Sequence, residues 1–596
     1  MKFYAAVVRW VARVLTLLLI SGSVWLEWGT PEVAWAQGRA AQPETARFVE
    51  SSAPVMVSLL DPADELGSLI QPTTRSLKDD SPDVELTHLP ASLLASVGLN
   101  YTTDIQPWVA DEITFALNQL TKDDPENGDG RKPVEAHRAP SYLIAFTTKG
   151  KRSSQDCIEA LWQKQVAAGR QLKFEQYNGI NLISTQLADS SESIPTAILP
   201  ESVPTPGALA TAVIENRYVL IANATSVLRQ VVHNLEFPDR QLANAPAYEQ
   251  ALAQLQAPQR DGLIFVNLAA LGSQGHQASS AVAPRYHSLA LSLSGLQQDL
   301  LVETVLVAAS EQDSAVATPT LSRSLQTLDY VPIGSPLVAA GPNLNQLWTQ
   351  LHEEVQGYAG LSGWLDRALS SWGRQWHLDL PQDIFPWVES EYTVAMVPPR
   401  SGATLGTPAT RTPEWVFIHE TDQNGNEQQL QHNLFDRAAG QGIGLIPYQQ
   451  DPYRQISAWA RVSSAPPVSN LASPAQPRLE AEVVGASAQV DHNQIMVTSL
   501  AALDSVLAAP QNGLAQQSSF RAAISPLEQP NQGYLYFDWP VIRPLLEQQL
   551  PMLRQLERAV PILFDQLQTV TVTSYGETSA GQRSQLFFRY DALDEG

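Results

Sequence analysis

Short apolar runs separated by polar turns dominate this chain. Residues 113–117 and 392–396 alternate between large apolar and smaller or polar side chains, which predicts two half-buried strands. Apolar runs at 142–146 and 218–222 predict two further strands. Such runs come in groups, and helical patterns interrupt them without strict alternation. The pattern therefore favours an α+β fold built on antiparallel sheet.

Helical periodicity appears between the predicted strands. Ile158, Leu161, Trp162 and Val166 fall on one face of a helix, and Gly169 follows as a typical C-terminal glycine. Other helical stretches are predicted near 225–235 and 247–256.

The same order of segments occurs twice. The stretch LNYTTDIQPWVADEITFAL at 99–117 resembles LDLPQDIFPWVESEYTVAM at 378–396. A shared Asp-x-x-Pro-Trp motif anchors the match, with Asp104, Pro107 and Trp108 in the first copy and Asp383, Pro386 and Trp387 in the second. Further matched residues keep the same order along the chain. We therefore predict two tandem homologous modules, each with antiparallel sheet and packed helices.

The predicted boundaries follow from this repeat and from polar linkers. They are a signal peptide at 1–36, a linker at 37–47, module one at 48–309, a linker at 310–324 and module two at 325–596. Module two carries an extra amphipathic stretch at 540–567, where module one has about fifteen loop residues. This insert is interpreted as a helix that packs on the protein itself, with a partner-binding helix as the alternative.

The first residues have the features of an export signal. Lys2, Arg9 and Arg13 precede a short apolar run, and Ala34-Trp35-Ala36 forms an A-x-A cleavage site. The apolar run is short for a membrane span of about 20 residues, so cleavage is favoured over an uncleaved anchor.

Charge and cysteine content narrow the function classes. The formal net charge of −24 disfavours nucleic acid and anionic lipid surfaces as partners. Cys157 is the single cysteine, which excludes an internal disulfide and a cysteine-based zinc site. We interpret this cysteine as structural.

Motifs for catalysis or metal binding are absent. The ten histidines show neither an i, i+4 pair nor HExxH, and no G-x-S-x-G occurs. Acidic turns at 122–132 and 422–426 lack the ligand spacing of a calcium loop. The glycines at 440, 442 and 444 follow a helix, the reverse of a nucleotide-binding loop. We therefore expect no catalytic residue, no cofactor and no metal.

The matched polar residues have a structural interpretation. Within the Asp-x-x-Pro-Trp motif, Asp caps a turn, Pro stiffens it, and Trp108 or Trp387 packs beneath the next strand; ligand stacking is the alternative. Glu112 and Glu391 are also matched, and neither has a visible acid–base partner in the sequence.

Several segments resemble an uncharacterised, largely cyanobacterial family, DUF3352. They are SAPVMVSLLDPADEL, GLNYTTDIQPWVADEITFAL, LWQKQVAAG, FEQYNGINLIS, VIENRYVLIAN and YLYFDWPVI. The resemblance implies no catalytic residues, and it implies the periplasm or the thylakoid lumen as the exported location.

The expected function is non-catalytic. Long loops recur at matched positions, 121–139 with 398–413 and 186–207 with 463–478, which is typical of recognition surfaces on a rigid scaffold. We expect an exported protein that binds a protein or envelope component in a scaffold or assembly role. A carrier of an apolar ligand and an exported hydrolase remain the alternatives.

Overall fold

The computed structural model describes the chain in segments. They are residues 42–60, 104–118, 141–167, 169–185, 209–257, 260–273, 285–296, 299–309, 321, 324–356, 366, 369–370, 379–398, 414–421, 434, 436–440, 442–447, 455–465, 478–549, 553–554, 557, 564, 566–578 and 580–591. The predicted signal peptide, the acidic turns 122–132 and 422–426, and the loops 121–139 and 186–207 lie outside them. Among the described helices, none is long and apolar enough to cross a membrane.

The first half of the chain contributes ten of the described strands. They are β1 (Val55–Leu59), β2 (Val109–Leu117), β3 (Tyr142–Thr148), β4 (Leu172–Tyr177), β5 (Ile180–Thr185), β6 (Ala210–Ile214), β7 (Tyr218–Ala222), β8 (Gly262–Asn267), β9 (Tyr286–Leu296) and β10 (Asp299–Ala308). Their antiparallel pairings give the spatial order β4-β5-β6-β7-β3-β2-β1-β8-β9-β10.

The second half contributes the other described strands. They are β11 (Leu337–Gly341), β12 (Tyr392–Met396), β13 (Trp415–Glu420), β14 (Ile443–Pro447), β15 (Gln455–Ala465), β16 (Arg478–Val490), β17 (Asn493–Val497), β18 (Tyr534–Asp538), β19 (Leu567–Thr578) and β20 (Gly581–Tyr590). Their order is β14-β15-β16-β17-β13-β12-β11-β18-β19-β20, again antiparallel throughout.

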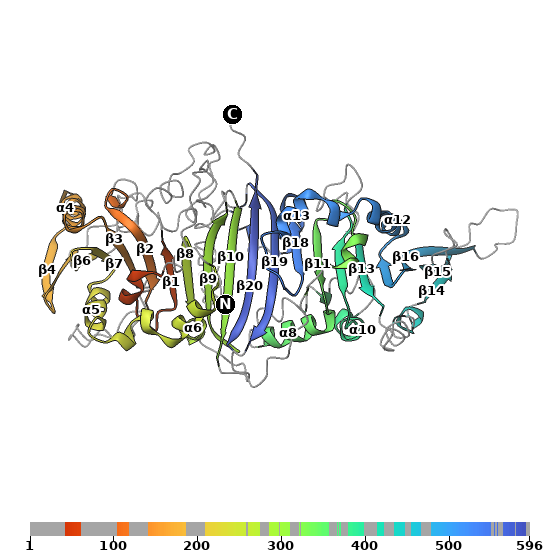
Figure 1. Cartoon of the computed structure of the whole chain (residues 1–596), viewed down its shortest axis with the longest axis horizontal. Helices are drawn as coiled ribbons and strands as arrows, with labels where there is room; N and C mark the ends of the chain where they lie inside the picture. The colour runs from red at the N-terminus through yellow and green to blue at the C-terminus, as the bar shows by residue number, and fades with distance from the viewer. Residues whose placement is uncertain are drawn as a thin grey trace, which may run out of the picture.

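One pairing joins the two halves into a single sheet. Strands β10 and β20 run antiparallel from Leu300–Phe588 to Val307–Gly581. Figure 1 shows them near the middle of the elongated molecule, with β4 and β14 at opposite ends. The mixed helix and strand content and the antiparallel sheet confirm the predicted α+β class.

Helices and short 3₁₀ turns connect the strands. The α-helices are α4 (Lys151–Ala167), α5 (Thr225–Asn234), α6 (Pro246–Gln254), α7 (Leu268–Ser273), α8 (Leu344–Gln356), α10 (Leu380–Asp383), α12 (Leu500–Ala508), α13 (Ser518–Ile524) and α14 (Trp539–Gln549). The 3₁₀ turns are η2 (Glu44–Phe48), η4 (Pro238–Arg240), η5 (Leu242–Asn244), η6 (Gln326–Tyr330), η7 (Phe385–Trp387), η8 (Ala509–Gln511) and η9 (Leu514–Gln516).

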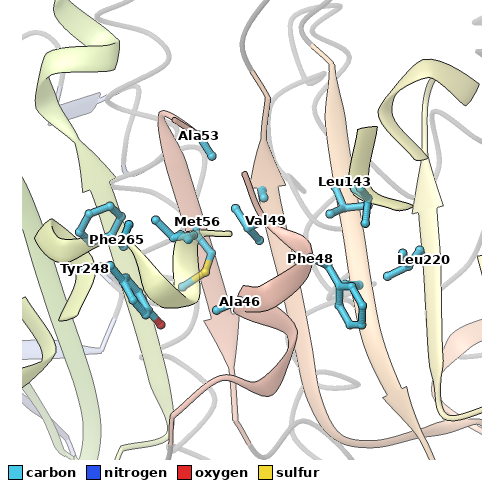
Figure 2. Close-up of a cluster of buried hydrophobic side chains, with 14 of the residues drawn as sticks. Ala46, Phe48, Val49, Ala53, Met56, Leu143, Leu220, Tyr248 and Phe265 are labelled. Atoms are coloured by element: carbon cyan, nitrogen blue, oxygen red, sulfur yellow. The ribbon is translucent and has the colours of Figure 1, made fainter. Parts of the chain in front are cut away.

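The first half buries both faces of its sheet. Along β3, Leu143 packs in one apolar cluster and its neighbour Ile144 in another, because successive side chains of a strand point to opposite faces. Figure 2 shows the first cluster, in which Phe48 of η2 and the Tyr248–Phe265 ring pair lie against the strands. Burial of both faces accounts for the continuous apolar runs at 142–146 and 218–222.

Two local predictions differ from the structure. Val166 was expected on the buried face of α4, yet it is 54% exposed, because Cys157, Leu161 and Trp162 carry the contact with the sheet. The segment after β8 was expected to be a loop, yet it begins with the short helix α7. Asn267 accepts the backbone N–H of Ala270 there at 3.0 Å, which caps that helix.

Candidate functional site

The first Asp-x-x-Pro-Trp motif forms a turn that leads into β2. The Asp104 carboxylate binds Lys164 Nζ of α4 at 2.6 Å. The backbone N–H of Trp108 donates to the carbonyl of Ile105 at 3.0 Å. The indole ring of Trp108 is partly buried against the apolar cluster beneath α4. The Asp therefore ties the turn to a helix, and the Trp contributes to packing.

The second motif makes the same kinds of contact. Asp383 is buried; it accepts the N–H of Asp379 at 2.8 Å and pairs with Arg437 at 3.2 Å. The backbone N–H of Trp387 donates to the carbonyl of Ile384 at 3.0 Å, as the backbone of Trp108 does in the first copy. Both motifs therefore place an Asp beside a basic side chain that lies later in the chain.

A buried acid network lies at the start of β2. Glu112 accepts the backbone N–H of Glu44 at 2.8 Å and that of Thr45 at 3.0 Å, together with the Thr45 hydroxyl. Thr114 links the same hydroxyl to Ser58 of β1. Burial raises the pKa of Glu112, and the hydrogen bonds from Thr45 and Glu44 oppose that rise. The network fastens η2 to the sheet.

An equivalent network lies in the second half. Glu391 accepts the N–H of Thr327 at 2.7 Å and its hydroxyl at 3.0 Å. The Thr327 and Thr393 hydroxyls lie 2.8 Å apart. The sequence analysis found Glu112 and Glu391 but missed their threonine partners. Thr45 and Thr327 are separated by the same number of positions as the matched pair Phe48 and Tyr330. This shared offset is the sequence signal that indicates the two threonines are equivalent.

A third set of charges spans the junction of the two halves. Arg583 of β20 binds the buried carboxylate of Glu303 on β10 and also reaches Glu528 at 2.7 Å. Glu303 in addition accepts the N–H groups of Gln256 and Ala257 at 2.8–3.0 Å. These contacts satisfy each buried charge, so this set reinforces the sheet junction.

A cleft of about 980 Å³ lies between α4 and strands β4, β5 and β6 and is called here the α4 cleft. Trp162 and Val166 form part of its helical wall, and Ile183 and Val213 part of its floor. The Trp162 indole N–H donates to the Thr211 hydroxyl at 2.9 Å, which fixes the ring. The cleft is thus mainly apolar, with a rigid aromatic residue in its wall.

Charge in the α4 cleft has one sign. Glu159 and Glu215 are the charged residues that line it, and no lysine or arginine does. Amide side chains complete its polar lining: Gln155, Gln163, Asn181 and Asn216. Such a surface favours an apolar occupant with a positive or hydrogen-bonding edge.

Reactive and metal-binding groups are not gathered elsewhere in the described residues. They contain no cluster of three or more His, Cys, Asp or Glu that could hold a metal ion. Cys157 is fully buried, and burial, followed by the charge of Asp104, raises the pKa of its thiol to about 12. A protonated, inaccessible thiol is a poor nucleophile. The Gly442 backbone has φ +72° in the turn before β14, a position that favours glycine.

The fold and these sites define an α+β protein with one extended antiparallel sheet, two buried acid networks and an apolar cleft near one end. The chain belongs to the family described as "Protein of unknown function (DUF3352)", which matches residues 10–590. No curated protein matches the chain.

Some solved structures resemble part of the chain. Crystal form I of TP0453 covers 46% of this chain and 82% of its own, at 10% identity and a TM-score of 0.24. Crystal form III covers 48% and 90%, at 9% identity and a TM-score of 0.23. Values this low carry no argument about function.

Proposed function

We propose that this protein binds another protein without catalysis, and that the α4 cleft receives an apolar segment of the partner. The observation that carries the proposal is an apolar cleft of about 980 Å³ with Trp162 held rigidly in its wall. Rigid aromatic residues in apolar depressions are common anchors of protein interfaces.

Charge and shape favour a particular kind of segment. Val166 stands 54% exposed at the edge of the cleft, so the cleft opens to solvent along its helical wall. An open cleft covers one side of its occupant, which suits an amphipathic polypeptide better than an enclosed small molecule. Glu159 favours a basic residue beside the apolar face of that segment, whereas Glu215 is already paired with Arg47 at 2.6 Å.

Site-specific photocrosslinking in the native source tests this proposal. A crosslinking residue at position 166 should trap a partner segment rich in apolar and basic residues. The same residue at Ala160, exposed on α4 and outside the cleft, is the matched control. Equal labelling from both positions, or none from position 166, would contradict the proposal.

A carrier of an apolar small ligand is the second candidate, because the cleft volume falls within the range of ligand pockets. Native mass spectrometry of protein purified from its source separates the two candidates. A bound small molecule that Val166→Glu removes supports the carrier, whereas a ligand-free protein that still crosslinks supports the protein partner.

We also propose that the protein is exported. The basic residues, the apolar run and the Ala34-Trp35-Ala36 site support this, and the family resemblance suggests the periplasm or thylakoid lumen. Mass spectrometry of the native N-terminus should find Gln37 first. An intact Met1 in the membrane fraction would replace cleavage by an anchor.

The two halves are further proposed to be homologous modules. Support comes from the shared strand order and from the Glu–Thr network that each half contains. Each half also has a contacting Tyr–Phe ring pair, Tyr248–Phe265 in the first and Phe520–Tyr536 in the second, with the two residue types in opposite order along the chain. Hydrogen exchange should then give matched strong protection at β1 and β11, which occupy the same interior place in the strand order of each half. Strong protection in one half alone would count against this.

A further inference from the structure

Strand β4 ends the sheet on the side of the first half. Among the described strands it pairs only with β5, so one row of backbone N–H and C=O groups faces outward. Phe174 lies in the middle of β4 and is 71% exposed, the highest value among the exposed large apolar side chains described. An edge strand with an exposed aromatic residue is a ready template for pairing with another chain.

The side chains of β4 separate onto two faces. Phe174 stands opposite Ile183, which stands opposite Thr211, so Phe174 shares the face that carries the α4 cleft. Lys173 and Glu175 point to the other face, where Arg229 of α5 holds Glu175 at 2.7 and 2.8 Å. The Lys173 side chain is 59% exposed, and its Nζ lies 3.9 Å from the carboxylate of Glu175 on the same strand.

We propose that β4 is the contact of a two-fold symmetric dimer, in which β4 of a second copy pairs antiparallel with it and Phe174 lies opposite its own counterpart. In this register Lys173 of each copy lies directly opposite Glu175 of the other. One such interface therefore contains two opposite-charge cross-strand pairs and a central aromatic pair. The contact is closed by its symmetry and extends the sheet across both copies.

Charge complementarity selects a second copy as the partner, because the order Lys-Phe-Glu is complementary to itself in antiparallel register. The strand at the other end of the sheet differs. Strand β14 carries no charged residue, and Pro447 supplies no backbone N–H for pairing. The dimer goes beyond the proposed binding function, since it uses the sheet edge and not the cleft.

Charge reversal of the purified full-length chain tests the dimer by analytical ultracentrifugation over a concentration series. Lys173→Glu places like charges opposite each other twice and should weaken dimerisation about tenfold or more. Glu175→Lys should do the same. Mixing the two variants restores both pairs, so the mixture should dimerise like the unaltered protein. Lys151→Glu makes the same charge change at an exposed position of α4 and should change nothing.

Thermal melts of each variant establish that it is folded, which matters most for Glu175→Lys because that change also removes the partner of Arg229. A monomeric unaltered protein at all concentrations would overturn the proposal and leave Lys173 as a charge that blocks edge pairing. A dimer that Lys173→Glu leaves intact, or that the mixture fails to restore, would also overturn it.

Discussion

A buried carboxylate is stable when hydrogen-bond donors replace the water around it, and Glu112 meets this condition. It accepts two backbone N–H groups and one hydroxyl from the 3₁₀ turn η2, and the hydroxyl of Thr114 on β2 at 3.2 Å. The side chain therefore satisfies donors that would otherwise be buried without partners. Glu391 does the same for η6 with one N–H group and one hydroxyl. Both acids therefore have a structural role: each accepts hydrogen bonds that attach a 3₁₀ turn to the sheet.

Removal of the Glu112 carboxylate should destabilise the protein strongly. Glu112→Ala leaves buried donors of Glu44 and Thr45 without an acceptor, at an expected cost of about 2–4 kcal/mol in the free energy of unfolding. Chemical denaturation measures this value. Asp111→Ala, one residue earlier and exposed, is the control and should change stability by about 0.5 kcal/mol or less. Equal effects of the two changes would contradict the network.

The titration of Glu112 should be visible in the pH dependence of stability. Burial raises its folded pKa above the ordinary value of 4.5, so the native state holds more protons than the unfolded state between these two pKa values. Stability contributed by this group is therefore lost as pH rises through that window. Glu112→Gln cannot titrate, and its unfolding free energy should decline less with rising pH than that of the unaltered protein. Parallel curves for the two proteins would argue against this assignment.

At the scale of elements, alternation and continuous apolar runs predicted the strands well, since these patterns reflect burial on one face or both. The strand expected at 142–146 is found as β3, Tyr142–Thr148. Helix α4 and its glycine end were also found as expected, with Gly169 at φ +81°. The burial of Gln165 and the exposure of Val166 were not predicted, because they depend on how α4 lies on the sheet.

Close approach between strands β11 and β18 requires a glycine immediately before β18, where the chain faces the end of β11. Gly533 has φ +111°, and a Cβ there would lie 2.1 Å from the Ala340 carbonyl oxygen. Gly533→Ala should therefore cost about 3 kcal/mol or more, because backbone atoms must move apart. Gly440→Ala is the matched control: nothing lies within 4 Å of its Cβ position. Thermal denaturation of both variants checks this, and a neutral Gly533→Ala would refute the close contact.

At the scale of the whole molecule, the β10–β20 strand pair joins the two halves into one sheet, and an apolar cluster with buried residues from both halves packs there, for example Leu300 with Phe588. Residues of β10 and β20 lie about 280 positions apart in sequence, and eight residue pairs are in register between them. Among the salt bridges described, only Arg583–Glu303 crosses this junction; the bond from Arg583 to Glu528 stays within the second half. Because Glu303 is buried, loss of its arginine partner should lower the free energy of unfolding more than loss of a partner from an exposed ion pair.

Loss of the junction arginine should weaken the protein at this point. Arg583→Met leaves the Glu303 carboxylate buried without its cation, at an expected cost of about 3–5 kcal/mol. Arg47→Met removes a partly exposed pair with Glu215 and the cation–π contacts with Phe48 and Tyr218, and should cost less, about 1–2 kcal/mol. Urea denaturation of the two variants gives the comparison. A cost at position 583 no larger than that at position 47 would show that this ion pair does not contribute to the junction.

The sequence by itself determined the secondary structure, the α+β class and the family, because apolar periodicity and ordered motifs are local properties of the chain. It also identified Glu112 and Glu391 as matched residues, although not their threonine partners. Only the tertiary structure decided the order of the strands, the β10–β20 junction and the α4 cleft. Strand pairing and clefts bring together residues such as Trp162 and Val213, or Glu303 and Arg583, whose contacts leave no periodic signal in the sequence.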